Sequence, residues 1–253
     1  LRATGYQLFI DTLRANLPPG GMLRMDHVMG LFRLLWIPRG MAASRGAYVT
    51  YPARELLAIL ALESARRQTL IIGEDLGTVP LRVRRELDKA GVFSYRVFYF
   101  ERDGDGHFLA PEAYPARAMA TITTHDLPTL AGFWQGHDLA LKQSLNLYPD
   151  ASLAEADAAA RQQDRRVLLE DLERRGLLPA GAVTPEPGDP CPLELREAVL
   201  DYLAQSSAAL MEVRLEEVFG VAEQQNLPGT RQEHPNWRVK LPLTLDRMEE
   251  SPE

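Results

Sequence analysis

The fold is decided by a short apolar run that ends on two carboxylates, TLIIGED at residues 69–75. An amphipathic stretch at 53–67 precedes this run, and a helical pattern from 80 to 91 follows it. A nearly continuous apolar strand between two helices is typical of a parallel sheet with helices on its outer side. The run therefore predicts the strand-then-helix unit of an α/β fold.

Similar runs recur along the chain. Further strands are predicted at 21–26, at 92–100, at 119–126 and around 215–219. Between them the pattern changes to long polar helices, predicted at 152–175 and 193–212, which we interpret as a helical insertion before the last strand. The sequence thus predicts three segments, at 1–134, 135–210 and 211–253.

The composition limits the classes of partner. The formal net charge of -7 argues against a nucleic-acid-binding surface, because such a surface needs clustered Lys and Arg. The single cysteine, Cys191, cannot form an internal disulfide, and no apolar run approaches the ~20 residues of a membrane span. We therefore expect a cytoplasmic protein whose partners are neither nucleic acids nor membranes.

Three acidic residues stand at the ends of predicted strands: Asp26, Glu74 and Asp126. Functional groups of parallel α/β barrels lie at the carboxyl ends of the strands, so these carboxylates are expected to converge on one site. Acids at strand ends also serve as helix caps, salt-bridge partners or metal ligands, and His27 and His125 could join them around a metal. Arg24 lies on the same strand face as Asp26, where its positive charge opposes a cation. We therefore expect neither a metal nor another cofactor.

The same residues suit the chemistry of glycosidic bonds. Arg24 would keep Asp26 ionised as a nucleophile. Retaining glycoside chemistry needs a second carboxyl that first donates and then accepts a proton, and Glu74 and its neighbour Asp75 are both candidates. The His-Asp pair at 125–126 would hold sugar hydroxyls as the ring approaches its positively charged transition state.

At these residues the chain resembles the amylomaltase or 4-α-glucanotransferase family, also called disproportionating enzyme, of the α-amylase clan. LRMDH at 23–27 resembles the nucleophile motif, GEDLG at 73–77 the acid/base motif and THD at 124–126 the third-carboxylate motif. Further similar stretches are WIPRG at 36–40, GAYV at 46–49, NLPGT at 226–230 and NWR at 236–238. The resemblance therefore covers most of the chain.

The resemblance implies a role for each matched residue. Asp26 is implied as the nucleophile, Glu74 rather than Asp75 as the acid/base, and Asp126 as the transition-state stabiliser. The implied substrate-binding residues are Arg24, His125 and Asn226. The implied activity is transfer of α-1,4-glucan segments between maltodextrins by a retaining double displacement. Two alternatives stay open: an α-glucan hydrolase of the same clan, and an inactive fragment that binds glucan.

The resemblance also implies a fold. Family members are much longer and contain a (β/α)8 TIM barrel, so this chain is expected to supply about strands four to eight, with the helical insertion before the last strand. The first segment would be the catalytic barrel segment, and the third would carry a substrate loop. A partial barrel leaves open strand edges, which would favour self-association.

Aromatic side chains are candidates for platforms that stack on sugar rings. The candidates are Trp36, Tyr48, Phe133, Trp134 and Trp237. Each residue of this kind is more often part of a core than a platform, at about two to one. The sequence does not choose among them.

Overall fold

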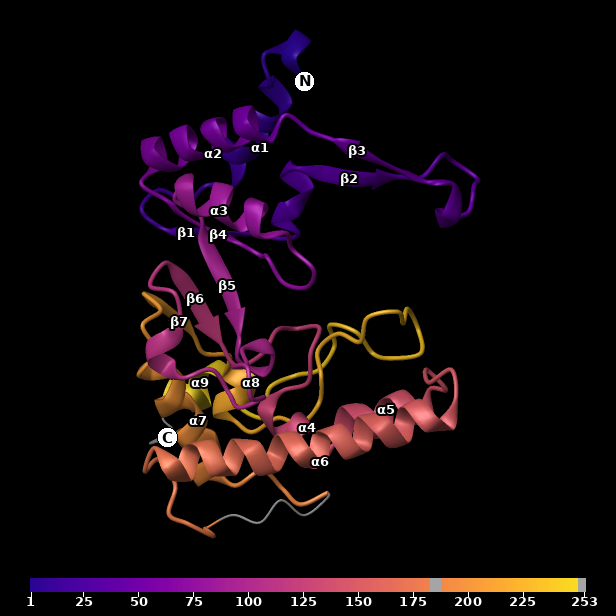
Figure 1. Cartoon of the computed structure of the whole chain (residues 1–253), viewed down its shortest axis with the longest axis vertical. Helices are drawn as coiled ribbons and strands as arrows, with labels where there is room; N and C mark the ends of the chain where they lie inside the picture. Colours follow the sequence, from indigo (N-terminus) through magenta and orange to yellow (C-terminus); the bar gives the residue numbers. More distant parts are fainter. Residues whose placement is uncertain (183–187, 250–253) are drawn as a thin grey trace. The chain divides into compact units, whose positions relative to one another are not determined.

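The computed structural model describes residues 1–182 and 188–249. Residues 183–187 and 250–253, which belong to the predicted insertion and to the predicted last segment, lie outside the described residues. The chain forms two compact units, whose elements are labelled in Figure 1. Unit 1 consists of Leu1–Arg96 and Pro115–Met119, and unit 2 consists of Val97–Tyr114 and Ala120–Glu253.

A five-stranded sheet has the strand order β1-β4-β5-β6-β7. Strand β1 pairs with β4, and β4 pairs with β5, in parallel. Neighbouring strands that follow one another along the chain, with helices between them, form an open part of a (β/α)8 barrel. The predicted α/β fold and partial barrel are therefore confirmed. The strands are β1 (Met22–Met25), β4 (Leu70–Gly73), β5 (Phe93–Val97), β6 (Ala118–Thr121) and β7 (Leu210–Glu212).

The helices of unit 1 are α1 (Gln7–Asn16), α2 (Ala53–Arg67) and α3 (Leu81–Lys89). Their apolar side chains share one core with those of β4, which includes the fully buried Leu60. Gly73 lies at the end of β4, where a Cβ atom would come within 2.9 Å of the Val92 side chain. The absence of a side chain at this position therefore lets the core close against the strand end that precedes Glu74.

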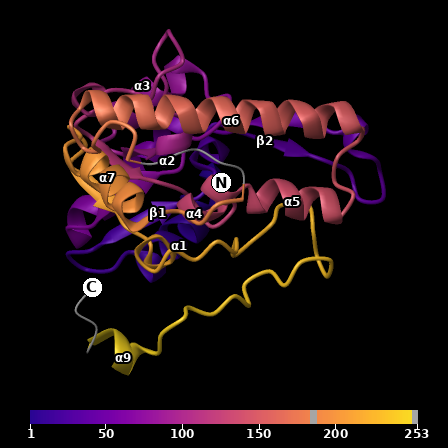
Figure 2. The ribbon, with the colours of Figure 1, turned by 90° about the horizontal axis from the view of Figure 1, so that it is seen from below.

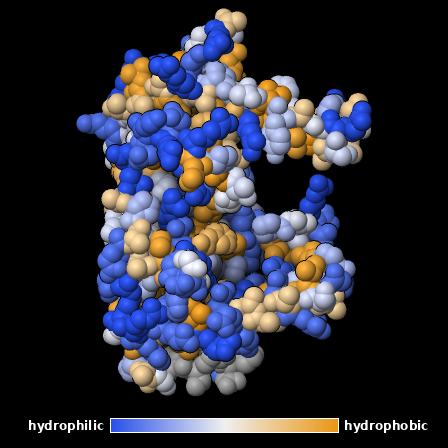
Figure 3. Space-filling view, viewed as in Figure 1, coloured by the Kyte–Doolittle hydropathy of each residue, from blue (hydrophilic) through white to orange (hydrophobic). Residues whose placement is uncertain are grey.

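A hairpin separates β1 from α2 along the chain. Its strands, β2 (Arg33–Trp36) and β3 (Ala47–Thr50), pair antiparallel, and all their residues are exposed. Trp36 is 58% exposed and Tyr48 is 62% exposed. Apolar side chains consequently gather on the surface of this arm (Figure 3).

Unit 2 is built on helices from the predicted insertion. Helix α6 packs against both α5 and α7 (Figure 2). Ten of the core side chains come from the segment 167–203, and they pack against aromatic residues such as Phe98 and Trp134. The segment 167–203 therefore supplies a large part of the core of unit 2. The helices are α4 (Leu130–Gln135), α5 (His137–Ser144), α6 (Ala151–Arg174), α7 (Leu193–Ala204), α8 (Leu215–Val218) and α9 (Leu245–Glu249).

Two predicted elements differ from the structure. The strand predicted around 215–219 is wrong, because Leu215–Val218 forms α8 and the last strand is Leu210–Glu212. Leu215 and Val218 are spaced as on one helix face, and acidic residues in the first turn favour the helix. The helix predicted to reach residue 212 ends at Ala204.

None of the helices described within 1–182 and 188–249 is long and apolar enough to span a bilayer.

Candidate active site

Asp26 and Glu74 follow two paired strands of unit 1. The register of β1 and β4 aligns Met25 with Gly73, so the next residues of the two strands are the two acids. The Glu74 N–H donates to the Met25 carbonyl at 2.9 Å, and the Val28 N–H donates to the Glu74 carbonyl at 3.1 Å. Main-chain pairing therefore brings these two distant positions together at the carboxyl ends of the strands.

Arg24 contacts the Asp26 carboxylate directly. Its Nη2 lies 2.9 Å from Oδ1 of Asp26. The guanidinium also lies over the ring of Tyr95, at 5.0 Å from the centroid. Residues two apart on a strand point to the same face, and the predicted pairing of Arg24 with Asp26 is observed. The ion pair orients a carboxylate whose side chain is 56% exposed and therefore accessible to a substrate.

His27 lies between the two carboxylates. Its N–H donates to Oε2 of Glu74 at 2.9 Å. Its ring nitrogens lie 3.4 Å from Oδ2 of Asp26 and 3.6 Å from Oε2 of Glu74. The Leu76 N–H donates to the other Glu74 oxygen at 2.7 Å. The Glu74 carboxyl is therefore fixed by two main-chain amides, and one imidazole bridges it to Asp26.

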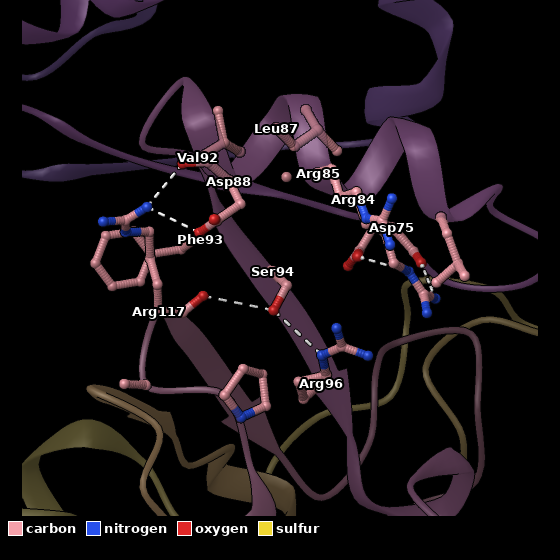
Figure 4. Close-up of a pocket in the computed structure, with 14 residues that line it drawn as sticks. Asp75, Arg84, Arg85, Leu87, Asp88, Val92, Phe93, Ser94, Arg96 and Arg117 are labelled. Carbon is pink, nitrogen blue, oxygen red and sulfur yellow. Dashed lines mark hydrogen bonds and ion pairs between the residues drawn. The ribbon is translucent and has the colours of Figure 1, made fainter.

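Asp75 has different partners from its neighbour Glu74. Its side chain is buried, lies 3.2 Å from Nε of Arg84 and accepts the Tyr95 N–H at 3.1 Å. Figure 4 shows Asp75 and Arg84 pointing toward each other at the edge of a pocket of about 510 Å³ that belongs to unit 1. Asp75 is thus a structural ion-pair partner, whereas Glu74 shares His27 with Asp26. This geometry favours Glu74 in the choice that the strand pattern left open.

Asp126 lies in unit 2, in the loop after β6. The Nδ2 of Asn226 donates to Oδ1 of Asp126 at 2.5 Å, and the Asn226 N–H donates to the His125 carbonyl at 3.0 Å. The His125 Nε2 lies 3.5 Å from the other Asp126 oxygen. Three of the predicted site residues therefore form one hydrogen-bonded group, although Asn226 is 100 residues away along the chain.

Gln224 completes this group and was not predicted. It is only 2% exposed, and its Nε2 donates to the main-chain carbonyls of Asp126 at 2.8 Å and of Asn226 at 2.6 Å. No local pattern indicates this residue, because its partner in the loop lies 98 residues away. The one hint was its position just before the NLPGT stretch at 226–230.

The loop that carries Asp126 is also anchored at its far end. The Thr129 hydroxyl donates to the Val221 carbonyl at 2.5 Å, and the Leu130 N–H donates to Oε2 of Glu217 at 2.9 Å. Burial raises the pKa of Glu217 to about 7. The other Glu217 oxygen, Oε1, is buried and has no hydrogen-bond partner among the described residues, which suits a protonated carboxyl.

A cavity of about 480 Å³ adjoins Asp126 within unit 2. Its volume falls in the range of about 300–1,000 Å³ that is usual for small-molecule sites. Most of its lining is apolar, with polar groups at a few positions. The lining includes Leu127, Pro128, Lys142, Tyr148, Leu227 and Pro228.

The predicted site residues thus fall into two groups. Arg24, Asp26 and Glu74 lie together in unit 1, and His125, Asp126 and Asn226 lie together in unit 2. Within the described part of the chain, no cluster of three or more His, Cys, Asp or Glu side chains could hold a metal ion. In the first group a guanidinium and an imidazole contact the carboxylates, and in the second an imidazole and a side-chain amide contact the carboxylate.

The chain matches the sequence model of the family described as 4-alpha-glucanotransferase over residues 1–244. It is 44% identical over 249 residues to the 4-alpha-glucanotransferase of Haemophilus influenzae, which covers 97% of this chain and 35% of that protein. It is 38% identical over 240 residues to the 4-alpha-glucanotransferase of Mycobacterium tuberculosis, which covers 93% of this chain and 32% of that protein. The chain therefore spans about a third of the length of these curated relatives.

Two solved structures share its fold. The amylomaltase from Corynebacterium glutamicum has a TM-score of 0.80 at 33% identity, over 91% of this chain and 32% of that one. The amylomaltase from Streptococcus agalactiae, solved in complex with acarbose, has a TM-score of 0.67 at 20% identity, over 98% of this chain and 43% of that one. The family match over residues 1–244 shows that the chain belongs to the 4-alpha-glucanotransferase family.

Proposed function

We propose that this chain carries the catalytic carboxylates of a 4-α-glucanotransferase, which transfers α-1,4-glucan segments between maltodextrins. One observation carries the proposal: the imidazole of His27 lies within 4 Å of both Asp26 and Glu74, at the ends of paired parallel strands. Retaining glycoside chemistry needs a nucleophile and an acid/base that act on the same bond. The family membership of the chain supports the same activity.

In the first half of the reaction, Asp26 attacks the anomeric carbon of the donor glucan. Glu74 donates its proton to the departing glycosidic oxygen, so a shortened glucan leaves and a β-linked glucosyl-enzyme remains. The contact between Arg24 and Asp26 supports this role, because it orients the attacking carboxylate.

In the second half, the 4-hydroxyl of an acceptor glucan attacks the same carbon. Glu74, now a carboxylate, takes the hydroxyl proton, the bond to Asp26 breaks, and an α-1,4 bond forms with retained configuration. We assign the stabilisation of the positively charged sugar ring to Asp126, and sugar binding to Arg24, His125 and Asn226.

The first test is incubation of the purified protein with maltotriose, followed by chromatography of the products. We expect glucose together with maltodextrins both shorter and longer than the trisaccharide. Asp26→Asn should abolish all products, while Arg54→Gln, a change on the exposed face of α2, serves as the matched control. Short products alone would support the hydrolase alternative, and glucan binding without turnover would support the inactive-fragment alternative.

The proposal also includes the cellular compartment and the partners of the protein. We expect a cytoplasmic protein that does not bind nucleic acids or membranes. Open strand edges of a partial barrel favour self-association, because unpaired N–H and C=O groups can pair with a second copy. Light scattering after size-exclusion chromatography measures this directly, and a monomer at all concentrations would contradict it.

A further inference from the structure

Trp237 combines features that a core residue does not have. Its side chain is 64% exposed, in contrast to Trp134, which is fully buried. Its backbone has a φ of 63°, in the left-handed region that side chains larger than that of glycine rarely adopt. Such a conformation costs on the order of 1–3 kcal/mol and persists where the surroundings hold it in place.

The surroundings of Trp237 hold this conformation from both sides. The Trp237 N–H donates to the Gln225 carbonyl at 2.8 Å, and the Arg238 N–H donates to the Pro235 carbonyl at 3.1 Å. The side chain of Asn236 accepts the Leu227 N–H at 2.9 Å and donates to the Thr230 hydroxyl at 2.9 Å. The loop therefore presents an exposed indole on a backbone that hydrogen bonds keep in one conformation.

The indole lies beside the group around Asp126. Its ring centroid is 4.9 Å from that of His125, with an interplanar angle of 41°. His125 in turn lies next to Asp126. In the sequence, Gln225 stands between Gln224 and Asn226, whose side-chain amides bind the Asp126 loop. Trp237 is thus connected to the candidate catalytic carboxylate by direct contacts within unit 2.

We infer that Trp237 forms, with His125, a stacking subsite for a glucosyl unit of the donor or acceptor chain. A pyranose ring has an apolar face of C–H groups, and a rigid exposed aromatic ring offers the complementary surface at a low entropic cost. The imidazole and the carboxylate beside it supply the polar contacts that the hydroxyl groups at the ring edge need. This inference rests on the proposed function, because it gives the same carboxylate group its sugar-binding surface.

The test uses Asp26→Asn protein, so that glucan binding is measured without turnover, with maltoheptaose as the probe in isothermal titration calorimetry. Trp237→Leu should weaken binding about tenfold, because it keeps an apolar side chain but loses the aromatic face. Trp237→Phe should stay within about threefold of the parent. Leu153→Ala, a change at an exposed position of α6, is the control and should leave binding unchanged.

In the active protein, Trp237→Leu should raise KM for maltotriose more than it lowers kcat, as expected for a residue that binds ground state and transition state alike. Equal affinities of the Leu, Phe and parent proteins for maltoheptaose would overturn the inference, and so would a parent that binds no maltoheptaose. Failure of the proposed function would show itself differently, as absence of transfer from maltotriose by the unsubstituted protein. Circular dichroism confirms that each variant is folded before binding is compared.

Discussion

The two groups of candidate site residues, one around Asp26 and Glu74 and one around Asp126, are held in place by different means. Asp26 and Glu74 lie side by side because the main chains of β1 and β4 pair in register. Asp126 is oriented by the amide side chains of Gln224 and Asn226, which come from a segment about 100 residues further along the chain. Main-chain pairing tolerates most side-chain changes, whereas a network of side-chain hydrogen bonds is weakened by the removal of any one member. Substitutions should therefore affect the two groups differently.

The largest effect is expected at the neighbouring acids 74 and 75. Glu74→Gln removes the proton donor, and transfer from maltotriose should fall by about 10²–10⁴-fold while the melting temperature stays near that of the parent. Asp75→Asn should lower stability rather than activity. It weakens the buried ion pair with Arg84, and the expected loss of stability is about 1–3 kcal/mol. Activity assays and thermal unfolding on both variants give the comparison. A larger activity loss in Asp75→Asn than in Glu74→Gln would contradict the assignment.

A smaller effect, visible in the pH dependence of stability, is expected at Glu217. Its pKa is raised by burial to about 7, so the folded state favours the protonated carboxyl. The stabilisation is fully present below about pH 4.5 and is lost as the pH rises through 7. Glu217→Gln cannot titrate, and it should be more stable than the parent above pH 7 by on the order of 3 kcal/mol.

Thermal unfolding of Glu217→Gln and of the parent between pH 5 and pH 8 measures this difference. Glu63 in unit 1 has the opposite pH dependence. Hydrogen bonding to Arg14 lowers its pKa, so its contribution to the stability of the folded state is lost as the pH falls. Parallel stability curves for the two proteins across this range would show that Glu217 is already ionised in the folded state.

The smallest effect is expected at Asn226. Asn226→Ala removes the hydrogen bond to Oδ1 of Asp126 but leaves Gln224 in place, so the loop keeps its main-chain contact. We expect transfer activity to fall about tenfold, equivalent to about 1.4 kcal/mol, with little change in melting temperature. An exposed residue of the same loop, Arg231, provides the matched control as Arg231→Gln. Full activity of Asn226→Ala would show that Asp126 does not depend on this amide.

The parts of the molecule that were predictable are those set by local patterns. The runs at 69–75 and 21–26 predicted strands that are present, because strand burial leaves a continuous apolar signature. The pairing of Arg24 with Asp26 followed from the alternation of side chains along a strand. The last strand was misplaced because a charged segment of only four residues, α8, carries too little periodicity to distinguish a helix from a strand.

The unpredicted parts depend on tertiary contacts. Gln224 and Glu217 are polar residues without a local motif, and their functions arise from partners 87 to 98 residues away. The exposure of Trp237 and the burial of Trp134 likewise cannot be read from residue type, since both depend on which distant parts of the chain pack against each side chain. The family motifs indicated the candidate acids and Asn226, but not Gln224 or Glu217, which also bind the loop of Asp126.

The 100-residue separation between Asp126 and Asn226 also has a consequence in time. A ribosome adds about 5–20 residues per second, and domains begin to fold as they emerge. The strand ends that carry Asp26 and Glu74 can pair as soon as residue 74 is available, whereas Asp126 must wait on the order of 5–20 seconds for its amide partner. During synthesis, the candidate nucleophile and acid/base are therefore assembled first, and the third carboxylate acquires its orientation only after residue 226 has been made.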